Sequence, residues 1–339
     1  MSSPDWGSNA FWADKTVLVT GAGGFIGSHL VEALGTRGAR VRALCHYNSM
    51  GSLGWLESLS PSLSANVTPV LGDIRDAGFV GELCNGVAVI YHLAALISIP
   101  YSYQAPESFL QSNAIGTLNV LKAAQQHGCA RIVNTSTSEV YGTPAELPIL
   151  ETHPLHGQSP YSASKIAADK ICEAYYCSYN LPVVTLRPFN TFGPRQSTRA
   201  VLASILVQLL TGKKEISLGR LDTRRDLTYV SDTVRGFFLT GETPGIEGET
   251  IQLGTGRTVS VQELFDAACE ATHREAAIIR REERMRPEAS EVLVLLSNPA
   301  KARKMLGWHA TTSLEEGIEK TVAWLKEHLG LYSHDRFYA

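Results

Sequence analysis

The feature that most restricts the fold is a short apolar run that leads directly into a glycine-rich loop. Residues 15–20 read Lys-Thr-Val-Leu-Val-Thr, residues 21–27 read Gly-Ala-Gly-Gly-Phe-Ile-Gly, and a pattern of helical spacing follows from Ser28 to Arg37. A strand, a glycine loop and a helix in this order are typical of a parallel βαβ unit whose helix N-terminus binds phosphate. The sequence therefore predicts an α/β fold.

Each glycine of this loop has its own expected role. Gly21 permits a tight turn, Gly24 lets the backbone approach a pyrophosphate, and Gly27 lets helix and strand pack closely. The spacing differs slightly from the Gly-x-Gly-x-x-Gly form, and glycine loops also serve as plain βα turns. Taken alone, the loop leaves dinucleotide binding and a plain turn both open.

Further apolar runs of strand length alternate with helical patterns. The runs occupy residues 39–45, 67–71, 87–92, 131–135 and 181–186, and one of the helices is expected to open at Asn113 and continue to Gln126. Strands that alternate with helices predict a doubly wound parallel (Rossmann) sheet with right-handed crossovers.

The elements become shorter and less regular after Gly193. Helices are expected over 200–210, 229–239, 261–271 and 315–328, with β pieces near Ile216 and over 249–253. We expect residues 1–190 to form mainly the NAD(P)-binding domain. Residues 191–339 should form mainly a smaller α/β substrate lobe over the carboxyl edge of the sheet, with some C-terminal segments returning to that sheet.

Composition excludes several classes of protein. The net charge of −3 does not indicate nucleic acid or an anionic membrane as a partner, and 44% apolar residues are ordinary for a globular core. No apolar run reaches the roughly 20 residues of a membrane span. The N-terminal residues lack the pattern of a signal peptide, so we expect a cytoplasmic protein. The six cysteines form no Cys-x-x-Cys pair, which favours reduced thiols and no metal site.

Two stretches bear on a dinucleotide without deciding its form. Residues 44–48 read Leu-Cys-His-Tyr-Asn, with neither the acidic residue that binds the ribose of NAD nor an Arg or Lys for the 2′-phosphate of NADP. Asp73 follows the third predicted strand. It is positioned either to accept a hydrogen bond from the adenine amino group or to cap a helix, and both readings stay open.

The segment that runs from the end of the predicted strand 131–135 into the next helix carries the candidate catalytic residues. They are Thr137, Ser138, Glu139, Tyr161 and Lys165. The Tyr and Lys are four residues apart, so both side chains share one helical face. An ammonium beside a phenol is expected to lower the pKa of the phenol, which then acts as a general base near neutral pH. Such a set suits removing a proton from an alcohol while a hydride leaves the same carbon.

The combined pattern resembles the extended short-chain dehydrogenase/reductase family, specifically its nucleotide-sugar branch. The matching pieces are the loop 21–27, Tyr161-Ser-Ala-Ser-Lys165, Arg187-Pro-Phe-Asn190, Gly193-Pro-Arg195, and Arg225-Asp226 with Tyr229 and Asp232. Residues 135–142 and 187–196 look most like the N-acetylglucosamine 4,6-dehydratases of legionaminic-acid pathways.

The resemblance implies a set of binding residues. Those for the cofactor, NAD with NADP not excluded, are Gly21, Gly24, Phe25, Ile26, Gly27, Asp73, Ile74, Leu93, Ala94, Ala95, Asn113, Tyr161 and Lys165. Those for the diphosphate of a nucleotide-sugar substrate are Asn190, Arg225 and Arg286, and a salt bridge to Asp226 is the structural alternative for Arg225. The resemblance also implies a homodimer formed through helices near Asn113 and Ser164.

Glu139 is the residue that separates the possible reactions within this branch. Sugar 4-epimerases usually carry small residues there, whereas 4,6-dehydratases place Thr, then Asp or Ser, then Glu. The resemblance therefore implies C4 oxidation by Tyr161 and Thr137, removal of the C5 proton by Glu139, and loss of the C6 hydroxyl. Ser138 departs from the Asp that many dehydratases use as the acid. The alternatives are a 4-epimerase, a nucleotide-glucuronate decarboxylase, a non-catalytic cofactor sensor and, for Glu139, a helix cap or salt bridge.

Overall fold

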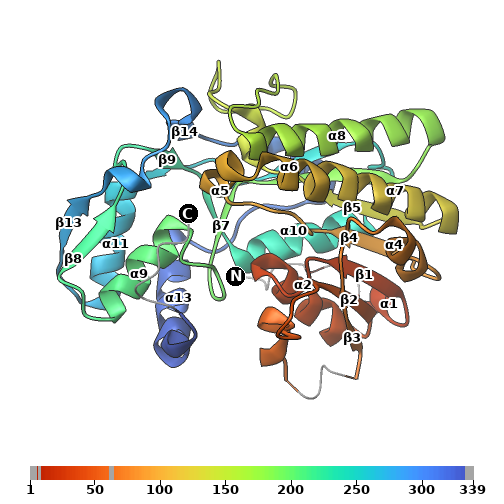
Figure 1. Cartoon of the computed structure of the whole chain (residues 1–339), viewed down its shortest axis with the longest axis horizontal. Coiled ribbons are helices and arrows are strands. Elements are labelled where there is room, and N and C mark those ends of the chain that lie inside the picture. Colours follow the sequence, from red (N-terminus) through yellow and green to blue (C-terminus); the bar gives the residue numbers. More distant parts are fainter. Residues whose placement is uncertain (1–5, 7–8, 61–64, 333–339) are drawn as a thin grey trace.

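The central sheet is parallel throughout and is built from the apolar runs of the sequence. The computed structural model describes residues 6, 9–60 and 65–332, and seven strands within these residues follow the order β11–β6–β5–β4–β1–β2–β3 (Figure 1). Their bounds are β1 Thr16–Thr20, β2 Arg40–His46, β3 Val67–Gly72, β4 Val89–His92, β5 Arg131–Thr135, β6 Val183–Pro188 and β11 Thr250–Leu253. The strand order reverses between β1 and β4, where doubly wound sheets bind ligands at their carboxyl edge. The predicted Rossmann fold is confirmed.

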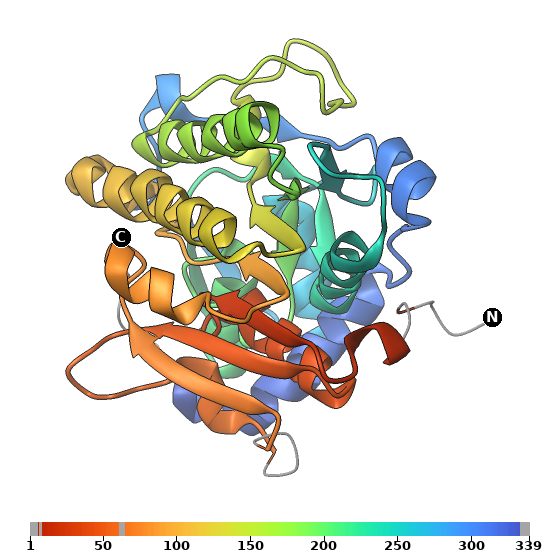
Figure 2. The same ribbon diagram turned by 90° about the vertical axis from the view of Figure 1, so that its right-hand side faces the viewer.

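Helices cover both faces of this sheet because alternate side chains of a strand point to opposite faces. In β1, Val17 and Val19 join one buried apolar cluster and Leu18 joins another. The first cluster includes α2 (Phe25–Thr36) and α10 (Val230–Glu242), and the second includes α4 (Ala77–Leu83), α7 (Gly116–His127) and α8 (Pro160–Tyr179). Helices α7 and α8 run side by side (Figures 1 and 2).

The helix expected to open at Asn113 begins earlier and is irregular. Short helices α5 (Ile99–Gln104) and α6 (Pro106–Phe109) lead into a π-helical turn over Leu110–Ile115, and α7 follows directly. Asn113 therefore lies inside a longer helical segment, and the prediction that it starts the helix is wrong. Its amide group turns inward to other elements, which explains why it occupies a distorted turn rather than an exposed cap.

A smaller lobe follows β6. Its elements are β7 Asn190–Phe192, α9 Val201–Leu210, β8 Glu215–Leu218, β9 Arg224–Arg225, β10 Leu227–Tyr229, β12 Val259–Ser260, α11 Val261–Thr272, β13 Ala277–Arg280, β14 Val294–Leu295 and α13 Leu314–His328. Strand β8 pairs in parallel with β13, and β9 lies between β12 and β14. Three later elements, α10, β11 and α12 (Ala300–Leu306), pack in or on the main sheet instead.

Two side-chain contacts hold the smaller lobe against α2, the helix that follows the glycine loop. Arg195 forms an ion pair of 2.8 Å with Glu32 of α2, and His29 of the same helix donates from Nε2 to the carbonyl of Pro194 at 3.0 Å. Burial, followed by the charge of Arg195, lowers the pKa of His29 to about 4, so the imidazole is neutral at pH 7. Within the described residues, no helix has the length and apolar character needed to cross a bilayer.

Candidate active site

The glycine loop forms a close turn at the carboxyl end of β1. Gly21 has φ +69°, and a Cβ there would lie 2.8 Å from the backbone nitrogen of Ala94. A Cβ on Gly27 would collide with the carbonyl oxygen of Gly21. Helix α2 begins at Phe25 after Gly24, and no side chain caps it, so the N–H groups of its first turn point to the loop. These features fit a pyrophosphate bound at the helix N-terminus.

The segment after β4 lies against this loop. The Thr20 hydroxyl accepts hydrogen bonds from the backbone N–H groups of Leu93 and Ala94, at 3.1 and 3.0 Å. His92 contacts the same hydroxyl through Nδ1 at 2.8 Å and the Thr117 hydroxyl through Nε2 at 3.0 Å. The structure therefore brings Leu93, Ala94 and the adjoining Ala95 beside the glycine loop. Sequence reasoning missed Thr20 as the residue that holds them there.

Asp73 is not a helix cap. Its carboxylate accepts from the backbone N–H of Arg75 at 2.9 Å and pairs with the Arg75 guanidinium, and this hydrogen bonding lowers its pKa. The N-cap of α4 is Asp76 instead, which accepts from the backbone N–H of Phe79 at 3.1 Å. Ile74, the next residue after Asp73, is buried. The capping alternative for Asp73 is thus wrong, and the adenine contact stays a prediction.

Asn113 connects the cofactor segment to the catalytic helix. Its Nδ2 donates to the carbonyl of Leu96 at 2.9 Å and to the hydroxyl of Ser164 at 2.9 Å, and its Oδ1 accepts from the N–H of Leu96 at 2.8 Å. Both N–H donors of the amide are therefore used within the protein. Asn113 thus holds the loop after β4 against α8, and its own contact with the cofactor stays a prediction.

The predicted catalytic residues come together at the carboxyl end of β5. Thr137 caps a 3-10 turn over Ser138–Tyr141, and its hydroxyl accepts from the Glu139 N–H at 3.2 Å and hydrogen-bonds the Tyr161 hydroxyl. Tyr161 stands in the first turn of α8, where Pro160 and a Ser159–Ser162 capping box fix the start of the helix. Tyr161 is buried, as is Ser138.

The pKa of Tyr161 differs from the sequence prediction. Burial raises it well above the usual value, the hydrogen bond from Thr137 lowers it, and the charge of Glu139 raises it again. Lys165 directs its ammonium at the carbonyl oxygen of Thr135, at 2.6 Å. The predicted lowering of the phenol pKa by Lys165 is therefore wrong for this state of the protein, because four-residue spacing sets proximity but not where the ammonium points.

An ion-pair network behind Lys165 anchors α8 to the sheet. Asp169 pairs with Arg187 of β6 at 2.9 Å and accepts from the Ser136 hydroxyl at 2.7 Å. Both charged side chains are almost fully buried, and Tyr141 also bonds Arg187 at 3.1 Å. Pairing of this kind satisfies charges that would otherwise be costly to bury. Sequence reasoning placed Arg187 in a motif but did not identify its partner.

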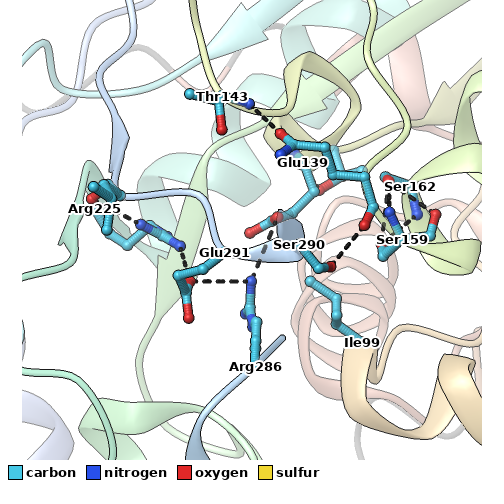
Figure 3. A network of polar contacts seen from close by, with 12 residues as sticks. Ile99, Glu139, Thr143, Ser159, Ser162, Arg225, Arg286, Ser290 and Glu291 are labelled. Carbon is cyan, nitrogen blue, oxygen red and sulfur yellow. Dashed lines mark hydrogen bonds and ion pairs between the residues drawn. The ribbon is translucent and has the colours of Figure 1, made fainter. Parts of the chain in front are cut away.

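Glu139 of the catalytic turn forms a cluster of four charges with Arg225, Arg286 and Glu291, shown in Figure 3. Arg286 Nη1 is 3.7 Å from Glu139 Oε2 and 3.8 Å from Glu291 Oε1, and Arg225 Nη2 is 3.8 Å from the same Glu291 oxygen. Glu139 is only 13% exposed. The Glu139 side chain thus faces the site that also holds Tyr161. This position excludes the helix-cap alternative, whereas the salt-bridge alternative is present as the ion pair with Arg286. Sequence reasoning missed Glu291.

The segment that carries Arg286 and Glu291 is tied to the dinucleotide-binding side. The Ser290 hydroxyl donates to the Gln158 carbonyl at 2.6 Å and contacts the Tyr103 hydroxyl at 2.6 Å, and Gln158 Nε2 donates to the Ala289 carbonyl at 2.9 Å. These bonds close the lobe over the catalytic turn. Gln158 directly precedes the Ser-Pro-Tyr start of α8, which was the only local signal for its role.

The remaining substrate candidate, Asn190, lies on a strand that pairs with the one following Arg225. Asn190 opens β7 and is exposed, and it pairs in register with Leu227, two residues beyond Arg225. The carboxylate of Asp226 accepts instead from Thr255 and Ser297, and Arg225 pairs with Glu291, so the structural alternative of an Arg225–Asp226 salt bridge is wrong. Within the described residues, no group of three His, Cys, Asp or Glu side chains is arranged to hold a metal ion.

Comparisons with known proteins identify the family. The family model described as GDP-mannose 4,6 dehydratase matches residues 18–321. The UDP-glucose 4-epimerase of Mycolicibacterium smegmatis is 34% identical over 315 residues, which cover 91% of this chain and 98% of that protein. The dTDP-glucose 4,6-dehydratase of Xanthomonas campestris pv. campestris is 31% identical over 331 residues, covering 91% and 92%.

A solved structure adds the cofactor. The dTDP-glucose 4,6-dehydratase of Streptomyces venezuelae, determined with NAD bound, superimposes with a TM-score of 0.82 at 28% identity and covers 94% of this chain and 98% of that one. Dehydratases and epimerases therefore appear at similar identity, and NAD is their common cofactor. The chain belongs to the GDP-mannose 4,6 dehydratase family, within the NAD-dependent nucleotide-sugar dehydratases and epimerases of the extended short-chain dehydrogenase/reductase class.

Proposed function

We propose that the protein is a nucleotide-sugar 4,6-dehydratase, which converts an NDP-hexose into its 4-keto-6-deoxy derivative. The observation that carries this proposal is the position of Glu139. Its carboxylate is nearly buried, lies on the turn that Thr137 caps, and acts electrostatically on the Tyr161 phenol. A 4-epimerase needs no base at C5, whereas elimination of water across C5 and C6 requires one.

The residues divide the proton transfers between them. NAD, when bound, supplies the hydride acceptor for C4 and later the hydride donor for C6. Tyr161 takes the proton of the C4 hydroxyl, to which Thr137 hydrogen-bonds, and the resulting ketone acidifies the hydrogen on C5. Glu139 removes that proton as the C6 hydroxyl leaves. Glu139 then delivers the proton to the departing hydroxyl, which Ser138 orients, and water is released. As C6 gains its hydride, C5 takes up a solvent proton in place of the one that Tyr161 gives back to solvent, so the overall oxidation state of the sugar does not change.

The substrate is held through its diphosphate. Arg225 and Arg286 direct guanidinium groups toward the catalytic turn, and planar guanidinium groups match phosphate oxygens. Asn190 is proposed to donate to the same diphosphate. Residues 135–142 support an N-acetylglucosamine nucleotide as the substrate, by the resemblance described above. We further propose a cytoplasmic homodimer formed through α7 and α8, which a mass measurement in solution tests.

The second candidate is a nucleotide-sugar 4-epimerase. The relative of 34% identity that carries this name supports it, and the Tyr161–Thr137 pair suffices for the C4 oxidation that an epimerase also performs. Against it stands the Glu139 carboxylate, for which an epimerase has no use.

The proposal is tested by incubating the NAD-loaded protein in D₂O with UDP-N-acetylglucosamine, UDP-glucose, dTDP-glucose, GDP-mannose and UDP-glucuronate. Proton NMR of the products separates the candidates. A dehydratase gives a 4-keto-6-deoxy sugar with deuterium at C5. A C4 epimer without deuterium at C5, or a pentose formed by decarboxylation of the glucuronate, would overturn the proposal.

A further inference from the structure

Glu291 is placed between the two arginines that are proposed to bind the diphosphate. One of its oxygens, Oε1, lies 3.8 Å from Arg225 Nη2 and 3.8 Å from Arg286 Nη1 (Figure 3). The Glu291 side chain is 9% exposed and that of Arg225 12%. Burial lowers the pKa of Arg225, and the charge of Glu139 opposes this effect. Groups this buried need opposite charges close by to remain ionised.

The contacts in this cluster are ion pairs without hydrogen bonds. All three nitrogen–oxygen distances exceed the range in which a guanidinium donates a hydrogen bond. Arg286 Nη1 is buried and has no hydrogen-bond partner, although Glu139 and Glu291 lie on either side of it. Buried donors are almost always satisfied in the working state of a protein. Arg225 Nη1 also donates to the carbonyls of Arg224 at 3.0 Å and Leu293 at 3.5 Å, which anchors that guanidinium to the backbone. Arg286 Nη1 and Arg225 Nη2, which meet Glu291 only at ion-pair distance, are the donors left for the oxygens of a ligand.

The residues on both sides of Glu291 are anchored to other parts of the protein. The preceding residue, Ser290, bonds Gln158 and Tyr103 across the site, each at 2.6 Å. The following residue, Val292, is 1% exposed and belongs to a buried apolar cluster. A carboxylate on a fixed backbone, at ion-pair distance from two arginines, is well suited to be exchanged for another anion.

We propose that Glu291 is a placeholder for the substrate diphosphate: it neutralises Arg225 and Arg286 in the free protein and yields both guanidinium groups to the incoming phosphates. This inference rests on the proposed function, in which these two arginines bind the diphosphate. The charges of Arg225, Arg286, Glu139 and Glu291 cancel in the free site. A diphosphate therefore binds by replacing the carboxylates as the partner of the arginines, and Glu291 is a positioning residue that keeps the arginines convergent until then.

The placeholder role predicts opposite effects on stability and on diphosphate affinity in a variant that lacks the Glu291 charge. In the free protein, Glu291→Gln leaves two arginines with one carboxylate between them, which destabilises that state. In the complex, the phosphates supply the missing negative charge. By linkage, the variant must be less stable when free and must bind a diphosphate more tightly than the wild type. A residue that served only to stabilise the fold would lower the stability of both states alike.

The experiment uses the NAD-loaded protein and measures binding without turnover. Calorimetric titrations with UDP, dTDP and inorganic pyrophosphate, the last a probe without a base, are compared with thermal unfolding of the same samples. Glu291→Gln is expected to unfold at a lower temperature when free and to bind the diphosphate probes about tenfold more tightly, a difference of about 1.4 kcal/mol. Glu291→Asp retains the charge and should bind within about threefold of the wild type.

Glu288→Gln is the matched control, since it removes the same charge from the same segment at an exposed position. It should leave the affinity for diphosphates unchanged. Glu291→Gln binding that is equal to or weaker than that of the wild type would overturn the placeholder role. Arg286→Gln, measured in parallel, separates this from the proposed function: weaker binding there keeps the diphosphate site, whereas unchanged binding overturns the site and the placeholder together.

Discussion

Arg286 and Glu139 approach to 3.7 Å, measured from Nη1 to Oε2, although one follows β13 in the C-terminal lobe and the other lies on the turn after β5. The contact joins a group proposed to bind the diphosphate to the group proposed to remove the C5 proton. In a nucleotide hexose, only the sugar ring separates the diphosphate from the hydrogen on C5. The short span between the two side chains is therefore what a site for this class of substrate requires.

Thr137 is expected to adjust the basicity of the Tyr161 phenol. Burial raises the pKa of Tyr161 and the Thr137 hydrogen bond lowers it, so Thr137→Val should raise the pKa further. A shift of about one pH unit would reduce C4 oxidation about tenfold at neutral pH. The rising limb of the pH profile for single-turnover reduction of the cofactor should move to higher pH, because Tyr161 acts only when deprotonated. Thr137→Ser, which keeps the hydroxyl, should retain the wild-type profile, and an unchanged profile for Thr137→Val would contradict the assignment.

Replacing Gly21 with alanine is expected to destabilise the fold and weaken NAD binding. The Cβ of Gly21→Ala would lie 2.8 Å from the Ala94 backbone nitrogen, in addition to the strain of φ +69°. Gly86→Ala is a matched control, because Gly86 has φ +70° and no atom within 4 Å of the added Cβ. The control should lose about 1 kcal/mol of unfolding free energy from φ strain alone. Gly21→Ala should lose more and bind NAD at least tenfold more weakly, as measured by urea unfolding and calorimetry.

His92 should make the fold sensitive to acid. Thr117 donates its hydroxyl proton to the Asn113 carbonyl, so His92 Nε2–H must donate to Thr117, and Nδ1 accepts from Thr20. Burial, with the Lys165 charge, lowers the pKa of His92 to about 3. The unfolded chain binds the proton more readily, so this contribution is complete above the unfolded pKa of about 6.5 and is lost as the pH falls toward 3.

The measurement compares urea unfolding of the wild type and His92→Gln between pH 7.5 and 5. The neutral glutamine amide has no proton to gain. Between pH 6.5 and pH 5, the unfolding free energy of the wild type should fall by about 1.4 kcal/mol per pH unit relative to the variant. The total loss over this range should be about 2 kcal/mol. Parallel losses in both proteins would show that His92 does not carry this effect.

The sheet was predictable because its strands are continuous apolar runs between glycine and polar turns. The run 131–135 coincides with β5, and the run 67–71 is one residue shorter than β3. Parallel strands that are buried on both faces of a sheet are recognisable in a sequence as continuous apolar runs. The π-helical turn around Asn113 was not predictable, because the contacts of its amide with Leu96 and Ser164 come from distant parts of the chain.

The candidate site was predictable only where its residues are close in sequence. Thr137, Glu139 and Tyr161 lie on consecutive elements, so their common location follows from the topology. Glu291 has no local pattern that marks it, because its role depends on Ser290 reaching Gln158 across the two lobes. The pKa of the phenol was misjudged for a similar reason, since burial and the direction of a lysine side chain are tertiary properties.

The most direct test of the account is the reaction of Glu139→Gln with the nucleotide hexose that the wild type dehydrates. Single-turnover experiments would follow the absorbance of reduced nicotinamide together with the NMR spectrum of the sugar. The account predicts that reduced cofactor forms and persists, with a 4-keto sugar that still carries its C6 hydroxyl and its original C5 hydrogen. Dehydration by this variant at a rate near that of the wild type would contradict the assignment of Glu139 as the C5 base.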